Sequence, residues 1–350
     1  EGNSAKMGGG IYMKDNGAKA EMTGGSITHN KADGGGGVYI SDYNSNPRSL
    51  FTLKDGTISY NTAKSGGGIQ AFGDFNMDGG TIEENTAIGD PDPSINQGIG
   101  GGIDLVAATM NMTGGEIKNN HAKRSGGGVS IALSGARDSV FNMSGGTISG
   151  NPLTETSGKG AGVEFFTEST THSGTTYYTR MKMSGSAKVD VDNDVYVNDS
   201  RMITVDGTLT PAGGIAAVIT PKTYVAGRQV LEAGTGVTLA NETYKFAVTP
   251  QTSPAPQEWT VGGNGCLKQG RYTEVPYNQL EDYLANASAT EVNYIEVTGI
   301  SPADLTGSYA SPPDPGALGQ KIKANLSKKV ALKLPSGLSV TYMSACFSEC

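Results

Sequence analysis

The chain has 350 residues, enough for two or three domains, and a formal net charge of -8 at pH 7. This acidic balance argues against binding to nucleic acid or to an anionic membrane surface, because both attract clustered Lys and Arg. The three cysteines, Cys266, Cys346 and Cys350, are too few for a disulfide framework. No signal peptide and no apolar run of transmembrane length is recognisable.

Short blocks recur along the first part of the chain, and such repeats outweigh other sequence signals. The first block is a glycine run followed by an apolar-x-apolar triplet, as in GGGIYM, GGGVYI and GGGIDL. The second is FTL, FNM or MNM, and the third resembles GGTIxxN, as in FNMSGGTISGN at 141–151. The first block is headed in turn by Ile11, Val38, Ile69, Ile103, Val129, Val163 and Val195, about 31 residues apart.

These blocks predict short strands that are stable only when stacked on copies of themselves. Neighbouring side chains of a strand face opposite sides, so each block offers one apolar face. Glycine supplies the bends between the blocks. Three strands in about 31 residues predict an all-β fold, a right-handed parallel β-helix, over residues 1–245. The leucine spacing of a leucine-rich repeat is absent from these blocks.

An asparagine follows the third strand of five repeats. Asn tolerates the left-handed backbone region and hydrogen-bonds nearby backbone, which suits a corner. Stacked about 4.8 Å apart, these side chains are predicted to form a structural amide ladder; a ligand-binding row is the alternative. The ladder residues are Asn30, Asn61, Asn85, Asn120 and Asn151.

The pairing of GGG[IV] with IxxN resembles the GGA[IL] and FxxN repeats of polymorphic outer-membrane proteins and related bacterial adhesins. The resemblance covers about residues 8–200. It implies a β-helical scaffold and a location outside the cell or on the outer surface of a bacterium. In such proteins the repeats are scaffold, so the resemblance implies no activity.

Residues 188–239 keep the alternation without the glycine pairs and are expected to close the stack. Residues 246–275 are predicted to be capping strands, anchored by Trp259, and a linker, because an open end would expose unpaired strand edges. Residues 276–350 are predicted to alternate helix and strand, with helical spacing at Leu280 and Leu284.

The segment LPSGLSVTYMSACFSEC, 334–350, resembles the repeat of BspA-like leucine-rich surface proteins. Met343, Cys346, Phe347 and Cys350 match that family's M-x-x-C-F-x-x-C pattern. The resemblance implies that 276–350 begin a leucine-rich-repeat-like α/β array, with its cysteines packed as thiols. A disulfide or zinc pair at Cys346 and Cys350 is the alternative and lacks a second ligand pair. We therefore expect a fragment of a longer protein, with targeting signal and anchor elsewhere.

The outward positions of the first strands predict a solvated line of side chains about 4.8 Å apart. Asp104 and Glu164 lie two repeats apart on it, loosely the separation of an inverting carboxylate pair. They are the candidate catalytic residues of a polysaccharide lyase or glycoside hydrolase, although no Lys or Arg joins them. The full line is Tyr12, Tyr39, Gln70, Asp104, Ser130, Glu164 and Tyr196.

The outward positions of the second strands form another line, predicted to face solvent. It consists of Glu21, Thr52, Asn76, Asn111, Asn142 and Lys182. Flat polar rows with nearby tyrosines suit sugar binding, and they equally suit solubility. The predicted ligand-binding residues on the two lines are Tyr12, Tyr39, Gln70, Asn76, Asn111 and Asn142.

No cofactor or metal is predicted. The three histidines lie on different repeats, without HxH or HExxH spacing. Asp190, Asp192 and Asp194 alternate along an expected strand and offer a weak alternative, a calcium site.

The leading hypothesis is a non-catalytic surface module: a β-helical stalk or adhesin that leads into a leucine-rich recognition region. Expected partners are a host protein, another bacterium or a glycan, with no nucleic acid and no membrane insertion. A polysaccharide-degrading enzyme and a structural surface-layer or fibre component are the alternatives.

Overall fold

The computed structural model describes residues 1–14, 17–42, 47–92, 95, 97–307, 315–336 and 338. The described chain is rich in strands, and most of the pairings are parallel. It divides into two compact units, Glu1–Tyr224 with Gln229–Val237, and Val225–Arg228 with Thr238–Cys350.

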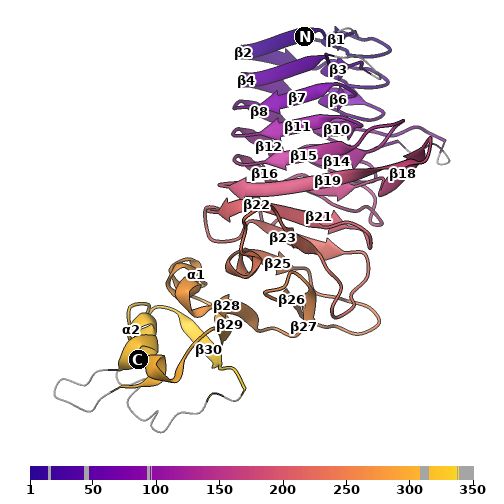
Figure 1. Ribbon diagram of the computed structural model, residues 1–350. Helices are drawn as coiled ribbons and strands as arrows, with labels where there is room; N and C mark the ends of the chain where they lie inside the picture. The colour runs from indigo at the N-terminus through magenta and orange to yellow at the C-terminus, as the bar shows by residue number, and fades with distance from the viewer. Residues whose placement is uncertain are drawn as a thin grey trace. The chain divides into compact units, whose positions relative to one another are not determined.

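The first strands of the repeats pair side by side in one parallel sheet of the first unit. Every predicted block head pairs with the next, from Ile11 with Val38 to Val163 with Val195, and Val195 pairs further with Ile219. Figure 1 shows these strands one below the other. They are β1 (Ile11–Met13), β3 (Val38–Ile40), β6 (Ile69–Ala71), β10 (Ile103–Val106), β14 (Val129–Ala132), β17 (Val163–Phe165), β21 (Asp194–Val197) and β23 (Ala217–Pro221).

The second strands stack in the same way. They are β2 (Lys19–Thr28), β4 (Leu50–Ser59), β7 (Asp74–Met77), β11 (Thr109–Met112), β15 (Ser139–Met143), β19 (Thr175–Gly185), β22 (Ile203–Leu209) and β24 (Leu231–Ala233). The hairpin strand β18 (Ser169–His172) pairs antiparallel with β19.

Second and third strands share one sheet, because β4 spans both blocks and pairs with both β7 and β8. The separate third strands are β8 (Thr81–Glu83), β12 (Glu116–Lys118), β16 (Thr147–Ser149) and β20 (Lys188–Val189). A short parallel sheet follows the corner asparagines, made of β5 (Thr62–Ala63), β9 (Thr86–Ala87) and β13 (His121–Ala122). This arrangement is compatible with a solenoid.

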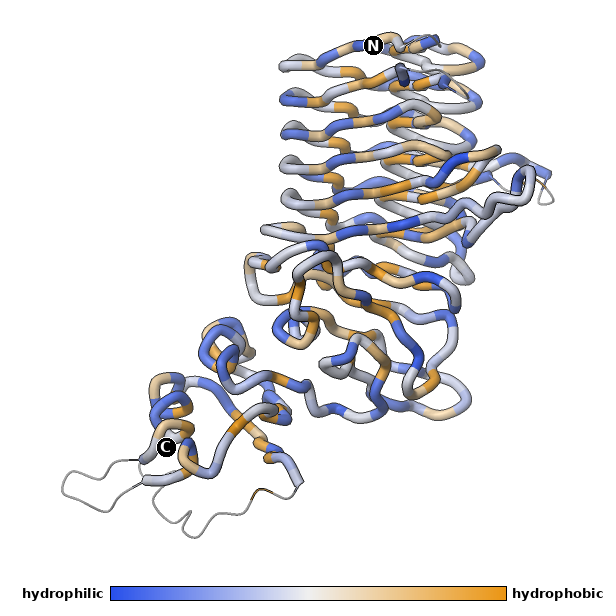
Figure 2. Tube along the Cα trace, in the orientation of Figure 1, coloured by the Kyte–Doolittle hydropathy of each residue, from blue (hydrophilic) through white to orange (hydrophobic). Residues whose placement is uncertain are grey.

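The interior of the first unit is filled by the inward side chains of the repeats. On β7, Phe75 and Met77 are fully buried and Asn76 between them is half-buried. Phe75 stacks on Phe51 of the preceding repeat at 5.9 Å between ring centroids. Burial of a Phe or Met side chain stabilises by roughly 1.5–3 kcal/mol. Figure 2 shows the alternation as hydrophobic and hydrophilic positions along each strand.

The corner after the third strand differs in one detail from the prediction. The left-handed backbone belongs to the residue before each ladder asparagine, not to the asparagine itself. His29, Tyr60, Glu84 and Asn119 have φ angles of 58°, 54°, 55° and 53°. The turn is made one residue earlier, and this leaves the asparagine free to point inward.

The second unit contains the predicted alternation of helix and strand. A parallel sheet of β28 (Thr273–Pro276), β29 (Val292–Thr298) and β30 (Lys329–Lys333) is joined through helices α1 (Leu280–Asn286) and α2 (Gly316–Lys323). Short 3-10 turns lie at Leu239–Asn241, Thr243–Lys245, Tyr277–Gln279 and Pro302–Leu305. Before the sheet come β25 (Phe246–Val248) and the antiparallel pair β26 (Trp259–Val261) and β27 (Leu267–Gln269).

The division between the units falls after Val237 rather than after 245, and residues 246–275 cluster with the sheet that follows. Tyr244 explains this difference. It is buried in the core of the second unit with Val275, Leu280 and Leu284. Its hydroxyl donates to Asp282 Oδ2 at 2.7 Å.

The predicted leucine-rich motif at Met343, Cys346, Phe347 and Cys350 lies outside the described residues. Within the described ranges, no helix combines the length and the apolar character needed to cross a membrane.

Candidate functional site

The outward line of the first strands has the predicted register but not the predicted exposure. Gln70 pairs with Asp104, and Glu164 pairs with Tyr196. Tyr12 is 49% exposed, whereas Asp104 is 2% and Glu164 is 6% exposed. The prediction of a solvated face is therefore wrong for most of this line, since its buried members are Tyr39, Asp104, Ser130, Glu164 and Tyr196.

A glycine run lies close to every buried member of this line except Tyr196. Gly66 and Gly160 have φ angles of +61° and +63°, which turn the backbone back over the strand that follows. A Cβ on Gly66 would lie 2.7 Å from Cβ of Gln70, and a Cβ on Gly160 would lie 2.9 Å from Cβ of Glu164. Only glycine combines this backbone conformation with so close an approach. The repeated glycines thus bury the line beneath main chain.

The carboxyl groups of Asp104 and Glu164 are consequently buried and largely inaccessible to solvent. Asp104 Oδ2 accepts a hydrogen bond from Gln70 Nε2 at 2.9 Å. Asp104 Oδ1, Ser130 Oγ and Glu164 Oε2, on three successive strands, are buried without a hydrogen-bond partner in the described part of the chain. Burial raises the pKa of both carboxyl groups to about 7, and nearby polar groups offset it only in part. Neither carboxyl group faces the exterior, where a polymeric substrate would lie.

The corner asparagines form a continuous buried ladder. The backbone N and Nδ2 of Asn61 both donate to Asn85 Oδ1, at 3.0 Å each. Asn85 repeats this pattern toward Asn120, at 3.1 and 2.9 Å, and its Nδ2 also donates to the carbonyl of Ile58 at 2.8 Å. The five predicted residues, Asn30, Asn61, Asn85, Asn120 and Asn151, are at most 1% exposed. Their position excludes contact with a ligand and makes the row structural.

Two rungs of the ladder were missed in the sequence. Asn3 donates from N and Nδ2 to Asn30 Oδ1, and Asn193 Oδ1 accepts from N and Nδ2 of Asn151. Asn3 precedes Ile11 by eight residues, as Asn30 precedes Val38, so its spacing carried the signal. Asn193 comes four residues after Val189, whereas each of the five predicted rungs comes three residues after an isoleucine. The spacing rule therefore does not identify Asn193.

The outward line of the second strands remains open. Asn142 Nδ2 donates to Asn111 Oδ1, and Asn111 Nδ2 donates to Asn76 Oδ1, each at 2.9 Å. All three residues are half-buried. Each ladder bond uses one N–H and one lone pair of an amide, so further donors and acceptors face outward. We call the full outward line, from Glu21 to Glu232, the polar face.

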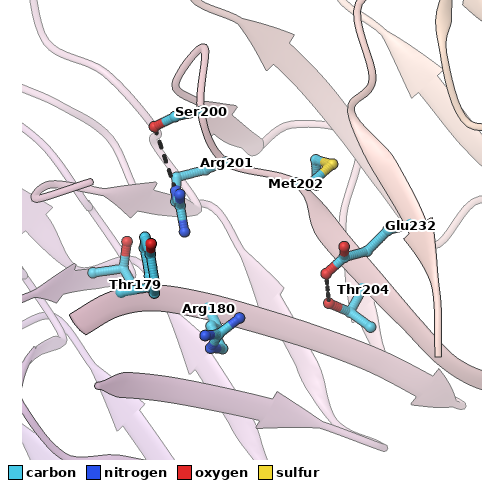
Figure 3. A pocket seen from close by; sticks show the side chains of 8 residues that line it. Thr179, Arg180, Ser200, Arg201, Met202, Thr204 and Glu232 are labelled. Carbon is cyan, nitrogen blue, oxygen red and sulfur yellow. Dashed lines mark hydrogen bonds between the residues drawn. The ribbon is translucent and has the colours of Figure 1, made fainter. Parts of the chain in front are cut away.

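Beyond Asn142, the polar face continues through register pairs. Asn142 pairs with Lys182, Lys182 with Thr204, and Thr204 with Glu232. Near this end, β19 and β22 border a cavity of about 220 Å³. Figure 3 shows Arg180 and Arg201 on one side of it, and Thr204 with Glu232 on the other. We call this cavity the arginine pocket.

The arginine pocket was not found in the sequence. Arg180 occupies an outward position two residues before Lys182, and Arg201 lies in the loop before β22. Both guanidinium groups lie over the ring of Tyr178, at 5.3 and 4.7 Å from its centroid. The loop has no counterpart in the repeat pattern, so no spacing rule pointed to it.

Asp190, Asp192 and Asp194, the residues of the weak calcium alternative, do not alternate along one strand as predicted. Asp190 and Asp192 lie in a turn rather than in a strand, which removes the expected alternation. Asp192 Oδ2 accepts from the backbone N of Gly150, and Asp194 Oδ1 accepts from that of Ala161. Asp190 pairs with Lys188 at 3.3 Å. Within the described ranges, no three His, Cys, Asp or Glu side chains converge as metal ligands.

Comparison of the chain with protein-family models, with curated proteins and with solved structures found no match.

Proposed function

We propose that residues 1–245 form a right-handed parallel β-helix and that the protein is a non-catalytic module of a bacterial surface, extracellular, with the role of a stalk or adhesin. In this proposal the module binds a glycan along the polar face and leads into a leucine-rich recognition region. The observation that carries it is the row of Asn76, Asn111 and Asn142, whose amides are aligned by hydrogen bonds of 2.9 Å.

Alignment matters because it fixes three amides before any ligand arrives. An amide held by its neighbour loses little rotamer freedom on binding, so more of the interaction energy is available for affinity. Adjacent strands lie about 4.8 Å apart, a spacing that repeats regularly across the face. A glycan chain carries hydroxyl groups along its length, and these can pair with the outward donors and acceptors.

The burial of Asp104 and Glu164 supports a binding role over the polysaccharide-degrading alternative. General acid and base groups must reach the substrate directly or through one water. Both carboxyl groups instead lie under the glycine-rich main chain. The polar face itself offers amides and hydroxyls at its centre, groups that bind sugars.

The test is a panel of neutral and acidic polysaccharides in which binding and the release of reducing or unsaturated ends are measured in the same samples. We expect binding without release. We also expect Asn111→Ala to weaken binding about fivefold, because one hydrogen bond contributes about 1 kcal/mol. Isothermal titration calorimetry with the best ligand measures this change.

The matched control is Lys118→Ala, on β12 of the same repeat but beyond the glycine corner. Its affinity should equal that of the parent protein. Release of new chain ends, lost in Asp104→Asn or Glu164→Gln, would overturn the proposal in favour of an enzyme. Failure of every glycan to bind would overturn it in favour of a purely structural role.

A further inference from the structure

The arginine pocket combines a cavity with an excess of positive charge on one wall. Arg180 contacts Asp138 through Nε alone, at 3.3 Å. Arg201 forms no ion pair with any described residue, and its one hydrogen bond is to Ser200 Oγ at 3.5 Å. A guanidinium group has five N–H donors, so most donors of this pair are not used by the residues that the structure describes.

The positive charge of Arg201 is not fully balanced by the groups around it. Burial lowers the pKa of Arg201, and the charge of Arg180 lowers it further, while Tyr178, Glu168 and Glu232 act in the opposite direction. Glu168 is engaged elsewhere, by Ser200 Oγ at 2.5 Å and by Lys222 at 3.6 Å. An anion placed between the two guanidinium groups would relieve their mutual repulsion.

The opposite wall of the pocket has a different chemistry. Thr204 Oγ1 donates to Glu232 Oε1 at 2.6 Å, which holds the carboxylate in place. The second oxygen of Glu232 can accept a hydrogen bond from a ligand hydroxyl. A ligand that fits both walls carries a negative group at one end and hydroxyl groups at the other.

We propose that the arginine pocket binds a hexuronic acid residue of a polysaccharide, with its carboxylate between Arg180 and Arg201 and its ring hydroxyls toward Thr204 and Glu232. This inference rests on the proposed glycan-binding function and names the acidic class of glycan. A carboxylate on a sugar ring has the planar, two-oxygen geometry that a guanidinium fork recognises.

The register of the strands places the pocket at the end of the polar face. Lys182, Thr204 and Glu232 follow Asn142 in the same outward line, so a chain lying on the asparagine row passes Lys182 and then reaches the Thr204 and Glu232 side of the pocket, which Arg180 and Arg201 also line. The acidic residue then fixes the position of the chain along the face. The asparagines contact neighbouring sugars without regard to charge.

The experiment compares oligogalacturonates with their fully methyl-esterified forms, which keep the ring and lose the charge. Affinity is measured by calorimetry for the parent protein, Arg201→Ala and Arg201→Lys. We expect Arg201→Ala to weaken binding of the acid at least tenfold and to leave binding of the ester unchanged. Arg201→Lys should recover part of the loss, because it restores charge without the planar fork. A sulfated polysaccharide is included as a third ligand.

Arg271→Ala is the matched control. Arg271 also lies 4.7 Å from a tyrosine ring, that of Tyr294, but its guanidinium is paired with Glu258 at 2.8 Å. Binding by this variant should equal that of the parent protein. Circular dichroism confirms that each variant is folded.

Three results would overturn the inference while leaving the proposed function intact: equal affinity of the parent protein for acid and ester, parent-like affinity of Arg201→Ala for the acid, or preference for the sulfated polysaccharide over the uronate. Absence of binding by both acid and ester, with the rest of the panel also silent, would instead overturn the proposed function. If Asn111→Ala loses binding of the ester while Arg201→Ala binds the ester as the parent protein does, the asparagine row and the arginine pocket are two separate binding sites.

Discussion

Replacement of Asn120 by alanine is expected to lower the free energy of unfolding of the first unit by about 3–5 kcal/mol. Asn120 Oδ1 accepts from the backbone N and Nδ2 of Asn85, at 3.1 and 2.9 Å. Asn120 Nδ2 donates to Asn151 Oδ1 and to the carbonyl of Ile82, at 3.0 and 2.9 Å. Alanine removes all of these side-chain interactions at once.

The effect is large because the groups left behind are buried. Asn85 and Asn120 are 0% exposed, so water cannot replace the lost acceptor without opening the corner. Each buried donor or acceptor left without a partner costs about 1–3 kcal/mol. The loss is measured by urea denaturation followed by circular dichroism.

Asn111→Ala is the internal control for this prediction. Asn111 belongs to the same repeat and also lies in an amide ladder, but it faces outward and is half-buried. Water can satisfy its neighbours, so we expect a loss below about 1 kcal/mol. Equal losses for the two variants would show that burial of the corner ladder does not contribute to stability.

A second large effect is expected from pH, since stability should fall as pH rises from about 4 to about 7. Asp104 and Glu164 have pKa values of about 7 in the folded chain, because burial disfavours their charged forms. In the unfolded chain both titrate near pH 4. Between these values the folded protein holds protons that the unfolded chain has lost, so raising the pH favours unfolding.

The two carboxyl groups contribute their full stability below about pH 4 and have lost it once the pH exceeds about 7. Each pKa unit corresponds to about 1.4 kcal/mol, so a shift of about three units gives a loss of about 4 kcal/mol for each group. For Glu164 the charges of Lys159 and Arg124 and a hydrogen bond from Ser125 act against this trend, and Asp194 acts with it. For Asp104 the opposing groups are Gln70 and Ser130.

The measurement is the free energy of unfolding in urea at pH 4 and pH 8. The double variant Asp104→Asn/Glu164→Gln should match the parent protein near pH 4 and exceed it in stability at pH 8, because its amides imitate the protonated acids. Glu155→Gln, which changes an exposed carboxyl group, should leave the pH dependence as it is in the parent protein. A double variant that retains the parent's slope would contradict the prediction.

The strand blocks, their stacking register and the corner ladder could be read from the sequence. Alternation identifies the inward residues, and the spacing of Ile and Asn identifies which positions meet across repeats. The predicted pairs Tyr39 with Gln70 and Asn76 with Asn111 occur in the structure. Local pattern was sufficient because each contact joins equivalent positions of neighbouring repeats.

Exposure could not be read from alternation. Alternation predicts that a side chain pointing away from the interior faces solvent, but Asp104 and Glu164 are covered by glycine-rich main chain. The covering depends on where a loop folds, which the strand pattern does not encode. The positive φ of Gly100 and Gly160 is the physical cause, and a glycine run alone does not reveal that angle.

The arginine pocket lay beyond sequence reasoning for a different reason. Arg180 and Arg201 are separated by the strands β20 and β21 and the turns around them, and they line one pocket because β19 pairs with β22. Nothing repeats at these positions. A site formed by residues outside the repeat pattern can be recognised only when the positions of the strands are known.

The corner ladder also has a direction. From Asn3 to Asn151 each rung donates to the rung that follows it, and at Asn193 the series ends with Nδ2 turned to the carbonyl of Asp192. Every repeat therefore brings one acceptor for its predecessor and one pair of donors for its successor. Duplication or deletion of a whole repeat leaves all of these groups matched, whereas a shorter insertion at the corner does not. The length of the stack can thus change in steps of one repeat without disturbing the chemistry of its interior.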